Sequence, residues 1–217
     1  MINSVNNLIT IQETLKNKIK ISKQSNIIAV SKTFPIKNIS PLINHGHEHY
    51  GENKVQEATE KWTTIKQDFT NIKLHMIGKL QTNKVKHVIP LFDYIHTLDN
   101  LKLAEKIATE EIKKNKKLKI FIQVNIGKEN QKNGIELENL NEFYELCKKD
   151  FKLDIIGLMC IPPQNRNSET YFVEMKKISV EMGLTDLSMG MSEDYLNAAK
   201  NDATFLRIGS KIFGKRD

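Results

Sequence analysis

The chain has 217 residues, of which 39% are hydrophobic and 27% are charged, and its formal net charge is +7. This composition excludes a disordered chain, and no apolar run is long enough to cross a bilayer. The first residues, Met1 to Gln12, alternate polar and apolar side chains and lack the apolar block of a signal peptide. We therefore expect a cytoplasmic protein that does not bind a membrane.

The positive charge is spread along the chain. Its densest stretch, residues 113–119, falls at a predicted helix end, where lysines suit the negative end of the helix dipole. A solvated surface is therefore favoured over a nucleic-acid patch, and we expect no nucleic-acid partner. Cys147 and Cys160 lie in apolar surroundings without a C-x-x-C spacing, which indicates reduced, buried thiols.

Segments with helical and strand periodicity alternate along the chain. The first predicted helix covers residues 5–20, where Leu8, Ile11, Leu15 and Ile19 recur at helical spacing. The continuous apolar run at 27–31 then predicts a buried parallel strand. Seven further strands are expected at 47–50, 73–77, 94–98, 119–125, 155–159, 186–190 and 204–208. Further helices are expected at 53–66, 81–88, 100–115, 137–149, 168–182 and 194–201.

Eight strands that alternate with helices predict parallel strands joined by right-handed crossovers. We therefore expect an α/β protein with a closed (β/α)8 TIM barrel, formed as a single domain over residues 1–217. A doubly wound open sheet is the alternative. Against it, the first strand is followed by Ser-Lys-Thr-Phe-Pro, which is not a glycine-rich dinucleotide turn.

Lys32 follows the first predicted strand directly. The two-residue period of a strand places Ile28, Val30 and Lys32 on one side. If that side faces the barrel interior, Lys32 stands in the mouth above apolar residues, where desolvation lowers the pKa of an ammonium group. A neutral amine is what Schiff-base chemistry requires. A surface lysine just past a strand is the alternative interpretation.

Two turns rich in small residues follow the seventh and eighth predicted strands. They contain Ser188 and Ser192 in the first turn, and Gly209 and Ser210 in the second. Glycine lets the backbone approach an anion closely, and hydroxyl groups add hydrogen-bond donors. The loops after strands seven and eight hold a phosphate in many barrels, so the pair of turns predicts a phosphate site.

Three further polar residues fall near the predicted mouth, and each has two interpretations. Arg207 lies inside an apolar strand, so it either forms a core salt bridge or donates to a ligand. Asn53 either caps the helix that it precedes or reaches a ligand. His75 is either a packed core histidine or a wall of the pocket. The histidines at 45, 47 and 49 do not have the spacing of a metal site, and we expect no metal.

Together these residues resemble the YggS/PROSC family of pyridoxal 5′-phosphate (PLP)-binding proteins, which are also called PLP homeostasis proteins. The resemblance extends from Ala29 to Gly214 and departs from the family at Lys79, where a small residue or proline is usual. The matching segments are Ala29–Lys32, Gly51–Glu57, His75–Lys84, Gln123–Asn125, Lys132–Gly134, Gly157–Met159, Leu187–Ser192 and Arg207–Gly214.

The resemblance implies a fold like the N-terminal barrel of alanine racemase, with PLP as the cofactor. Lys32 matches the lysine that carries PLP as a Schiff base, and Arg207 matches the arginine that approaches the pyridine nitrogen. Asn53 and His75 match positions that line the pocket. The residues Ser188, Ser192, Gly209 and Ser210 fall in the turns that hold the phosphate.

An arginine against the pyridine nitrogen disfavours the pyridinium form, which weakens the cofactor as an electron sink. A racemase also needs acid and base groups on both faces of the substrate carbon, and this chain ends at Asp217, soon after the barrel motif. We therefore expect a monomeric PLP carrier or regulator and not an enzyme, with PLP-requiring apo-enzymes as candidate partners. A PLP-dependent amino-acid racemase or related enzyme is the alternative.

Overall fold

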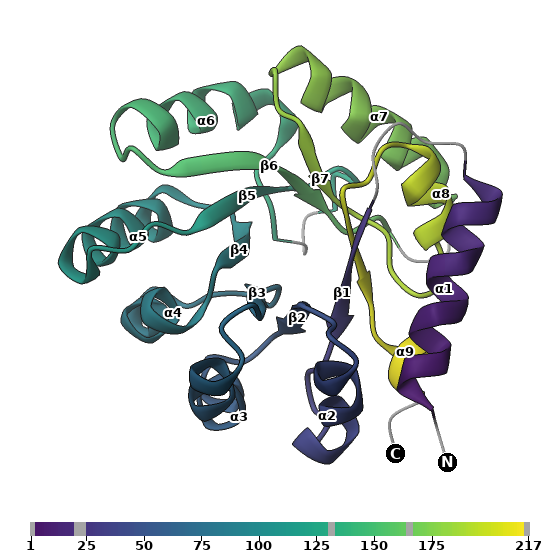
Figure 1. Cartoon of the computed structure of the whole chain (residues 1–217). Coiled ribbons are helices and arrows are strands. Elements are labelled where there is room, and N and C mark those ends of the chain that lie inside the picture. The colour runs from purple at the N-terminus through teal and green to yellow at the C-terminus, as the bar shows by residue number, and fades with distance from the viewer. Residues whose placement is uncertain (1–2, 20–24, 130–132, 164–166, 215–217) are drawn as a thin grey trace.

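The chain forms a closed barrel of eight parallel strands, as the alternating pattern predicts (Figure 1). The computed structural model describes residues 3–19, 25–129, 133–163 and 167–214. The strands pair in sequence order, and β1 closes the ring against β8. Their bounds are β1 (Asn26–Val30), β2 (His49–Glu52), β3 (Lys73–Met76), β4 (Tyr94–Leu98), β5 (Lys119–Val124), β6 (Asp154–Cys160), β7 (Asp186–Ser188) and β8 (Phe205–Ile208).

Helices surround the ring of strands (Figure 1). They are α1 (Ser4–Lys18), α2 (Ile36–Asn44), α3 (Val55–Asp68), α4 (Val85–Leu91), α5 (Leu101–Lys114), α6 (Leu140–Lys149), α7 (Ser168–Glu181), α8 (Tyr195–Lys200) and α9 (Ser210–Phe213). Two short 3₁₀ turns, η1 (Thr82–Lys84) and η2 (Leu137–Asn139), lead into α4 and α6. In the described part of the chain, no helix is both long and apolar enough to cross a membrane.

Capping residues fix both ends of α5, which lie within one residue of the bounds that the sequence predicts. The side chain of Asn100 caps α5 by accepting a hydrogen bond from the backbone N–H of Leu103 at 2.9 Å. Asn115 ends the helix in the left-handed conformation, with φ of 46°. Lys113 and Lys114 occupy the last turn, as expected from the helix dipole.

The second strand begins two residues later than its sequence suggests. The predicted strand covered residues 47–50, but β2 runs from His49 to Glu52 and pairs with β3 so that Gly51 lies opposite His75. Gly51 faces the barrel interior, where an added Cβ atom would lie 2.8 Å from Ile28 and 2.9 Å from Ile77. Glycine is rare in strands, so Gly51 indicates a turn when the sequence is considered alone. In the fold, its lack of a side chain lets Ile28 and Ile77 approach closely.

Two short helices have no counterpart in the sequence prediction. α2 follows Pro35 and contains Pro41, and proline inside a segment weakens its helical pattern. α9 spans only four residues, which is about one turn. Both are stabilised by burial against their neighbours: Ile39 and Leu42 of α2 and Ile212 and Phe213 of α9 are buried.

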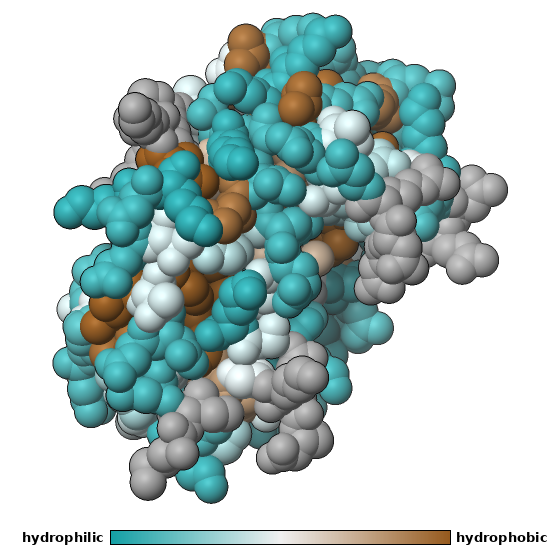
Figure 2. All heavy atoms as spheres, turned by 90° about the vertical axis from the view of Figure 1, so that its right-hand side faces the viewer, coloured by the Kyte–Doolittle hydropathy of each residue, from teal (hydrophilic) through white to brown (hydrophobic). Residues whose placement is uncertain are grey.

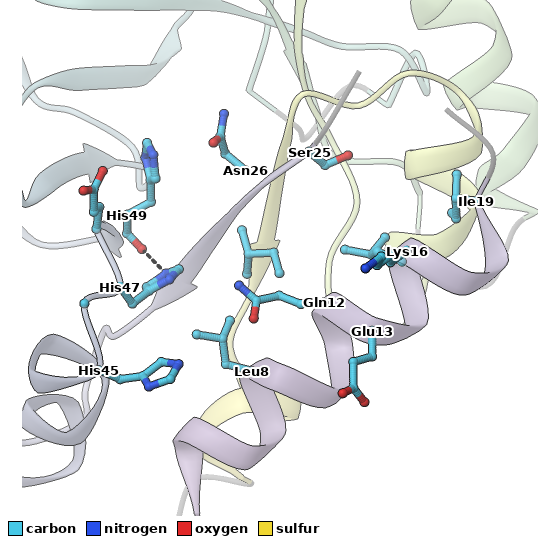
Figure 3. Close-up of a pocket in the computed structure, with 14 residues that line it drawn as sticks. Leu8, Gln12, Glu13, Lys16, Ile19, Ser25, Asn26, His45, His47 and His49 are labelled. Carbon is cyan, nitrogen blue, oxygen red and sulfur yellow. Dashed lines mark hydrogen bonds between the residues drawn. The ribbon is translucent and has the colours of Figure 1, made fainter. Parts of the chain in front are cut away.

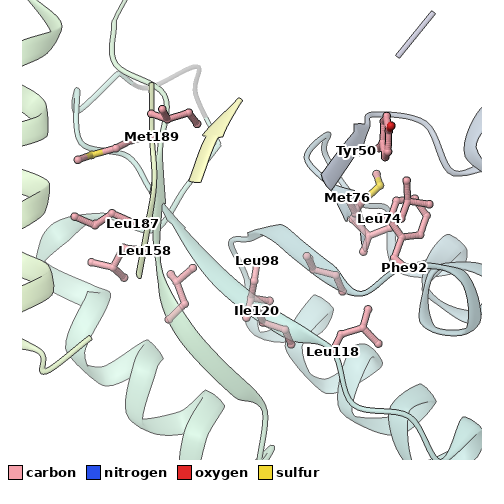
Figure 4. Close-up of a cluster of buried hydrophobic side chains, with 14 of the residues drawn as sticks. Tyr50, Leu74, Met76, Phe92, Leu98, Leu118, Ile120, Leu158, Leu187 and Met189 are labelled. Carbon is pink, nitrogen blue, oxygen red and sulfur yellow. The ribbon is translucent and has the colours of Figure 1, made fainter. Parts of the chain in front are cut away.

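Hydrophobic side chains pack in two layers. The larger layer lies between the outer face of the strands and the helices, and Figure 4 shows part of it around Leu74, Ile120 and Leu158. The smaller layer fills the barrel itself, with Ile28, Val30, Tyr94, Phe121, Met159 and Phe205. Ile28 and Val30 therefore face the interior, as the strand period predicts for the side that carries Lys32.

The first and last helices lie side by side over the seam between β1 and β8 (Figure 1). The Asn7 side chain of α1 donates a hydrogen bond to the backbone oxygen of Ile212 in α9, at 2.9 Å. Figure 2 shows this side of the molecule: hydrophilic side chains cover most of it, and hydrophobic ones gather in separate patches. The seam is thus closed by tertiary packing as well as by strand pairing.

Candidate functional site

Lys32 lies at the carboxyl end of β1, one residue beyond Ser31, and is half-buried. The carboxyl ends of barrel strands are where these folds build their sites. Strand β1 pairs with β8 so that Ala29 lies opposite Ile208, which places the end of β1 beside the turn at Gly209. A Cβ atom added to Gly209 would lie 3.4 Å from the Val30 backbone oxygen, so the two segments are in contact.

The loop that carries Lys32 is fixed by an ionic cluster from β2 and α3. Lys61 donates hydrogen bonds to the backbone oxygens of Ser31 at 2.9 Å and Phe34 at 3.3 Å, and it forms an ion pair with Glu52 at 2.8 Å. The Glu52 carboxylate is fully buried. It also accepts from the Ser31 hydroxyl at 2.8 Å and the Trp62 indole at 3.0 Å. We call Glu52, Glu57 and Lys61 the loop clamp.

Glu57 is the clamp member that contacts the residue after Lys32. Its carboxylate accepts hydrogen bonds from the backbone N–H of Thr33 and from Lys61, the latter at 2.8 Å. Thr33 has φ of 67°, a left-handed conformation that is unfavourable for a β-branched residue and needs outside support. Burial alone would raise the pKa of Glu57, but the hydrogen bonds from Lys61 and Thr33 outweigh it and lower the pKa.

The two predicted small-residue turns lie together. The backbone N–H of Lys211, after the second turn, donates to the Ser192 hydroxyl of the first turn at 3.4 Å. The backbone N–H of Arg207 donates to the Gly190 oxygen at 3.0 Å. Gly190 has φ of 84°, and a Cβ atom there would lie 2.4 Å from the Cβ of Ala198. Ser192 is buried, whereas Ser210 is exposed.

Arg207 is buried in the barrel interior and its guanidinium contacts neutral oxygens. It donates to the Ser188 hydroxyl at 2.7 Å and to the Cys160 backbone oxygen at 2.9 Å. Among the residues that the structure describes, it forms no ion pair with a carboxylate, so the salt-bridge interpretation of its sequence position is wrong for this part of the chain. Burial lowers the pKa of Arg207, but arginine keeps its charge in proteins.

Asn53 does not cap α3. The helix begins at Val55, and its N-cap residue Lys54 makes no side-chain hydrogen bond. The Asn53 side-chain oxygen is buried and has no hydrogen-bond partner within the described ranges. A buried acceptor without a donor is costly, which makes this oxygen available to a ligand. Gly78 allows the close approach, because a Cβ atom there would lie 2.4 Å from the Asn53 backbone oxygen.

His75 is fully buried within the barrel, and both of its ring nitrogens are engaged. Its Nε2 lies 2.9 Å from Nδ1 of His49, and its Nδ1 lies 2.9 Å from Nε2 of His96. His96 in turn contacts the Ser188 hydroxyl through Nδ1 at 2.8 Å. The sequence interpretation missed His96, although a histidine in the middle of a fully buried strand needs polar partners.

His47 and His49, whose spacing in the sequence does not fit a metal site, have different surroundings in the fold. His47 precedes β2, where its Nε2 lies 3.0 Å from the His49 backbone oxygen and its ring packs against the outward-facing Tyr50. His49 faces the interior, near Tyr94 and Phe205. In the described portion of the chain, no group of three or more His, Cys, Asp or Glu residues could hold a metal ion.

Two lysines of the dense stretch at 113–119 form hydrogen bonds and ion pairs within the protein. Lys116 donates hydrogen bonds to the backbone oxygens of Pro90 and Phe92, and Lys117 forms an ion pair with the buried Glu111 at 2.8 Å. These contacts tie α5 and the start of β5 to neighbouring loops. Lys132, which belongs to one of the matching segments, lies outside the described residues.

Comparison with known proteins first defines the class. The family model described as the N-terminal domain of alanine racemase matches residues 6–217. An alanine racemase of Clostridium difficile 630 shares the fold, with a TM-score of 0.73 at 16% identity, covering 99% of this chain and 57% of that one. At this identity the similarity concerns the fold alone.

Closer relatives define the family. A pyridoxal phosphate homeostasis protein of Aquifex aeolicus is 38% identical over 88% of this chain and 86% of its own, and one of Pasteurella multocida is 34% identical over 97% of both. The structure of PipY from Synechococcus elongatus with PLP bound gives a TM-score of 0.85 at 30% identity, covering 97% of this chain and 100% of that one. The chain belongs to the family of pyridoxal phosphate homeostasis proteins.

Proposed function

We propose that this protein binds PLP at the barrel mouth, holds it as a Schiff base on Lys32, and serves PLP homeostasis as a cytoplasmic carrier or regulator formed by a single barrel domain. The observation that carries the proposal is the position of Lys32: it is half-buried, and its clamped loop lies beside the turn at Gly209. When bound, PLP supplies an aldehyde for the lysine amine and a phosphate for the turns.

The residues around the mouth fit the parts of PLP. Ser192, Gly209 and Ser210 offer hydroxyl and backbone donors suited to a phosphate, in two turns that are joined by a hydrogen bond. The Asn53 oxygen is a buried acceptor with no donor in the described part of the chain, as expected for a group that a ligand satisfies. Ser188 and His75 lie deeper, and we assign them a positioning role because their contacts lead to Arg207.

A carrier is favoured over an enzyme by the charge beside the proposed pyridine site. Arg207 is a fixed cation, which disfavours a protonated pyridine nitrogen and so weakens the electron-withdrawing power that amino-acid chemistry uses. The relatives are named homeostasis proteins, in agreement with this role. We infer that PLP-requiring apo-enzymes receive the cofactor, and that the carrier acts as a monomer without nucleic acid.

The proposal is tested by reducing the PLP-loaded protein with borohydride and locating the modified lysine by peptide mass spectrometry. We expect the label on Lys32 and a near-visible absorbance band that is lost in Lys32→Ala. Lys37→Ala is the matched control, because Lys37 is an exposed lysine on α2 five residues away. A band that persists in Lys32→Ala, or a label on another lysine, would contradict the assignment.

The carrier role is tested separately from binding. Holo-protein is incubated with each L-amino acid, and the D-isomers are measured over time. Absence of turnover together with PLP transfer to an apo-enzyme agrees with the carrier role. Sustained racemisation that disappears in Lys32→Ala would instead establish the racemase alternative.

A further inference from the structure

Three histidines form a continuous hydrogen-bonded chain through the barrel interior. His49 at the start of β2 contacts His75 in β3, which contacts His96 in β4, and the nitrogen separations are 2.9 Å at both steps. His96 then contacts Ser188, whose hydroxyl accepts from Arg207. We call these three rings the histidine chain. It leads from the proposed ligand site to the opposite, N-terminal end of the barrel.

The histidine chain ends at His49, which faces a cavity at the N-terminal end of the barrel. This cavity has a volume of about 900 Å³ and lies between α1, the beginning of β1 and the segment before β2 (Figure 3). His49 is half-buried and lines it, with His45 and His47 nearby. Because Nδ1 of His49 is engaged with His75, its Nε2 is the nitrogen that can exchange a proton with water in the cavity.

The Ser188 end of the histidine chain determines the direction in which its hydrogen bonds are donated. Arginine only donates hydrogen bonds, so the Ser188 oxygen accepts from Arg207. Its second lone pair could accept from Nδ1 of His96, or its single proton could be donated there, and we take Ser188 as the donor. His96 must then carry its proton on Nε2 and donate to His75. The same reasoning gives the Nε2–H form for His75 and for His49, so every donor points towards the cavity.

The three rings are neutral near pH 7. Burial lowers the pKa of His75 and of His96 well below the ordinary value, and the charge of Arg207 lowers the pKa of His96 further. Burial also lowers the pKa of His49, while Glu48 and Asp93 raise it and Lys73 lowers it. A neutral imidazole has one donor and one acceptor nitrogen, which is the form that can pass a proton along a chain.

We propose that the histidine chain is a directed proton path that connects Ser188 and Arg207 with the cavity at the N-terminal end of the barrel. When a Brønsted acid bound against Ser188 gives its proton to the hydroxyl, Ser188 passes its own proton to His96. His96 passes its Nε2 proton to His75, His75 passes its Nε2 proton to His49, and His49 releases its Nε2 proton to water. The acid becomes its conjugate base, one proton reaches the cavity, and the chain reverses its direction.

The inference rests on the hydrogen bonds and not on PLP, so it can be tested on the protein without cofactor. Nitrogen-15 NMR of the imidazole rings is expected to show the Nε2–H form for all three histidines between pH 6.5 and pH 8, roughly the range in which lowered pKa values keep them neutral. An Nδ1–H form at His75 or His96, or a mixture of forms, would overturn the proposed direction. This measurement needs no variant.

The path itself is tested by the exchange of the ring N–H protons of His75 and His96 with solvent. In His49→Asn, the side-chain oxygen occupies the place of Nδ1 and still accepts from His75, but an amide does not relay a proton. We expect ring N–H exchange to slow by about tenfold or more while backbone amide exchange at Leu74 and Ile95 stays unchanged. His45→Asn is the matched control, because His45 is exposed and lines the same cavity but does not belong to the histidine chain. Unchanged ring exchange in His49→Asn would overturn the path.

Discussion

The loop that carries Lys32 and the turns at Gly190 and Gly209 are held in different ways. Charged side chains of the loop clamp, which come from β2 and α3, fix the loop through ion pairs and hydrogen bonds. The turns at Gly190 and Gly209 are fixed by backbone hydrogen bonds, and the first also by the space that Gly190 leaves. The position of the Lys32 amine therefore depends on side-chain electrostatics, whereas the proposed phosphate site depends on backbone geometry.

The strongest test of the clamp is Lys61→Met, which leaves the Glu52 carboxylate buried without its cation. Breaking a buried pair from one side destabilises a protein by about 3–5 kcal/mol. We expect a loss of this size in the free energy of unfolding, measured by urea denaturation, with a matching loss of PLP affinity. Lys177→Met is the control, because Lys177 forms an exposed pair with Glu181 on α7 at 3.8 Å. Equal, small effects in both variants would contradict the clamp.

The dependence of the first turn on backbone geometry is tested by substituting two glycines of similar conformation. Gly190 and Gly46 have φ of 84° and 86°, but only at Gly190 would a Cβ atom meet a neighbour, Ala198 at 2.4 Å. Gly46→Ala should destabilise the protein by about 1–2 kcal/mol through its left-handed backbone. Gly190→Ala should cost about 1–3 kcal/mol more through overpacking. Thermal unfolding measures both, and equal losses would show that the space at Gly190 is not needed.

Two asparagines separate ligand contact from structural support. Asn125 donates to Glu136 at 2.6 Å and to the Glu129 backbone oxygen at 3.2 Å, so Asn125→Ala should destabilise the protein by about 1–3 kcal/mol. Asn53→Ala removes an acceptor without a donor in the described residues and should leave the stability of the cofactor-free protein near that of the wild type. We expect it to weaken PLP retention in equilibrium dialysis. A stability loss in Asn53→Ala as large as in Asn125→Ala would contradict this assignment.

The smallest expected effect is the pH dependence that Glu57 contributes. Its pKa is lowered in the folded protein, so its stabilisation is fully present above the pKa of the unfolded chain, about 4.3, and is lost as pH falls through the folded pKa. In urea denaturation between pH 6 and pH 3, roughly, Glu57→Gln should lose less stability than the wild type as pH falls. Parallel pH profiles for the two proteins would show that Glu57 is not held in its charged form.

The sequence predicts the barrel well because alternating periodicity leaves few other topologies, and the strand period correctly turns Ile28 and Val30 inwards. It predicts the small-residue turns because their glycines and serines are close together in the sequence. It misses the loop clamp and the histidine chain because both depend on contacts between different strands and helices. A signal for each was present: a glutamate in a buried strand needs a cation, and buried histidines such as His75 and His96 need partners.

Arg207 gives the barrel interior a positive charge that no described carboxylate pairs with and that the neutral histidines do not offset. This buried cation makes a positive contribution to the electrostatic potential at the mouth before any ligand arrives. A doubly charged anion would be steered towards this end, and its association rate would fall as ionic strength rises, while exposed lysines elsewhere add only a diffuse background. The kinetics of capture would thus respond to salt more than the final complex does.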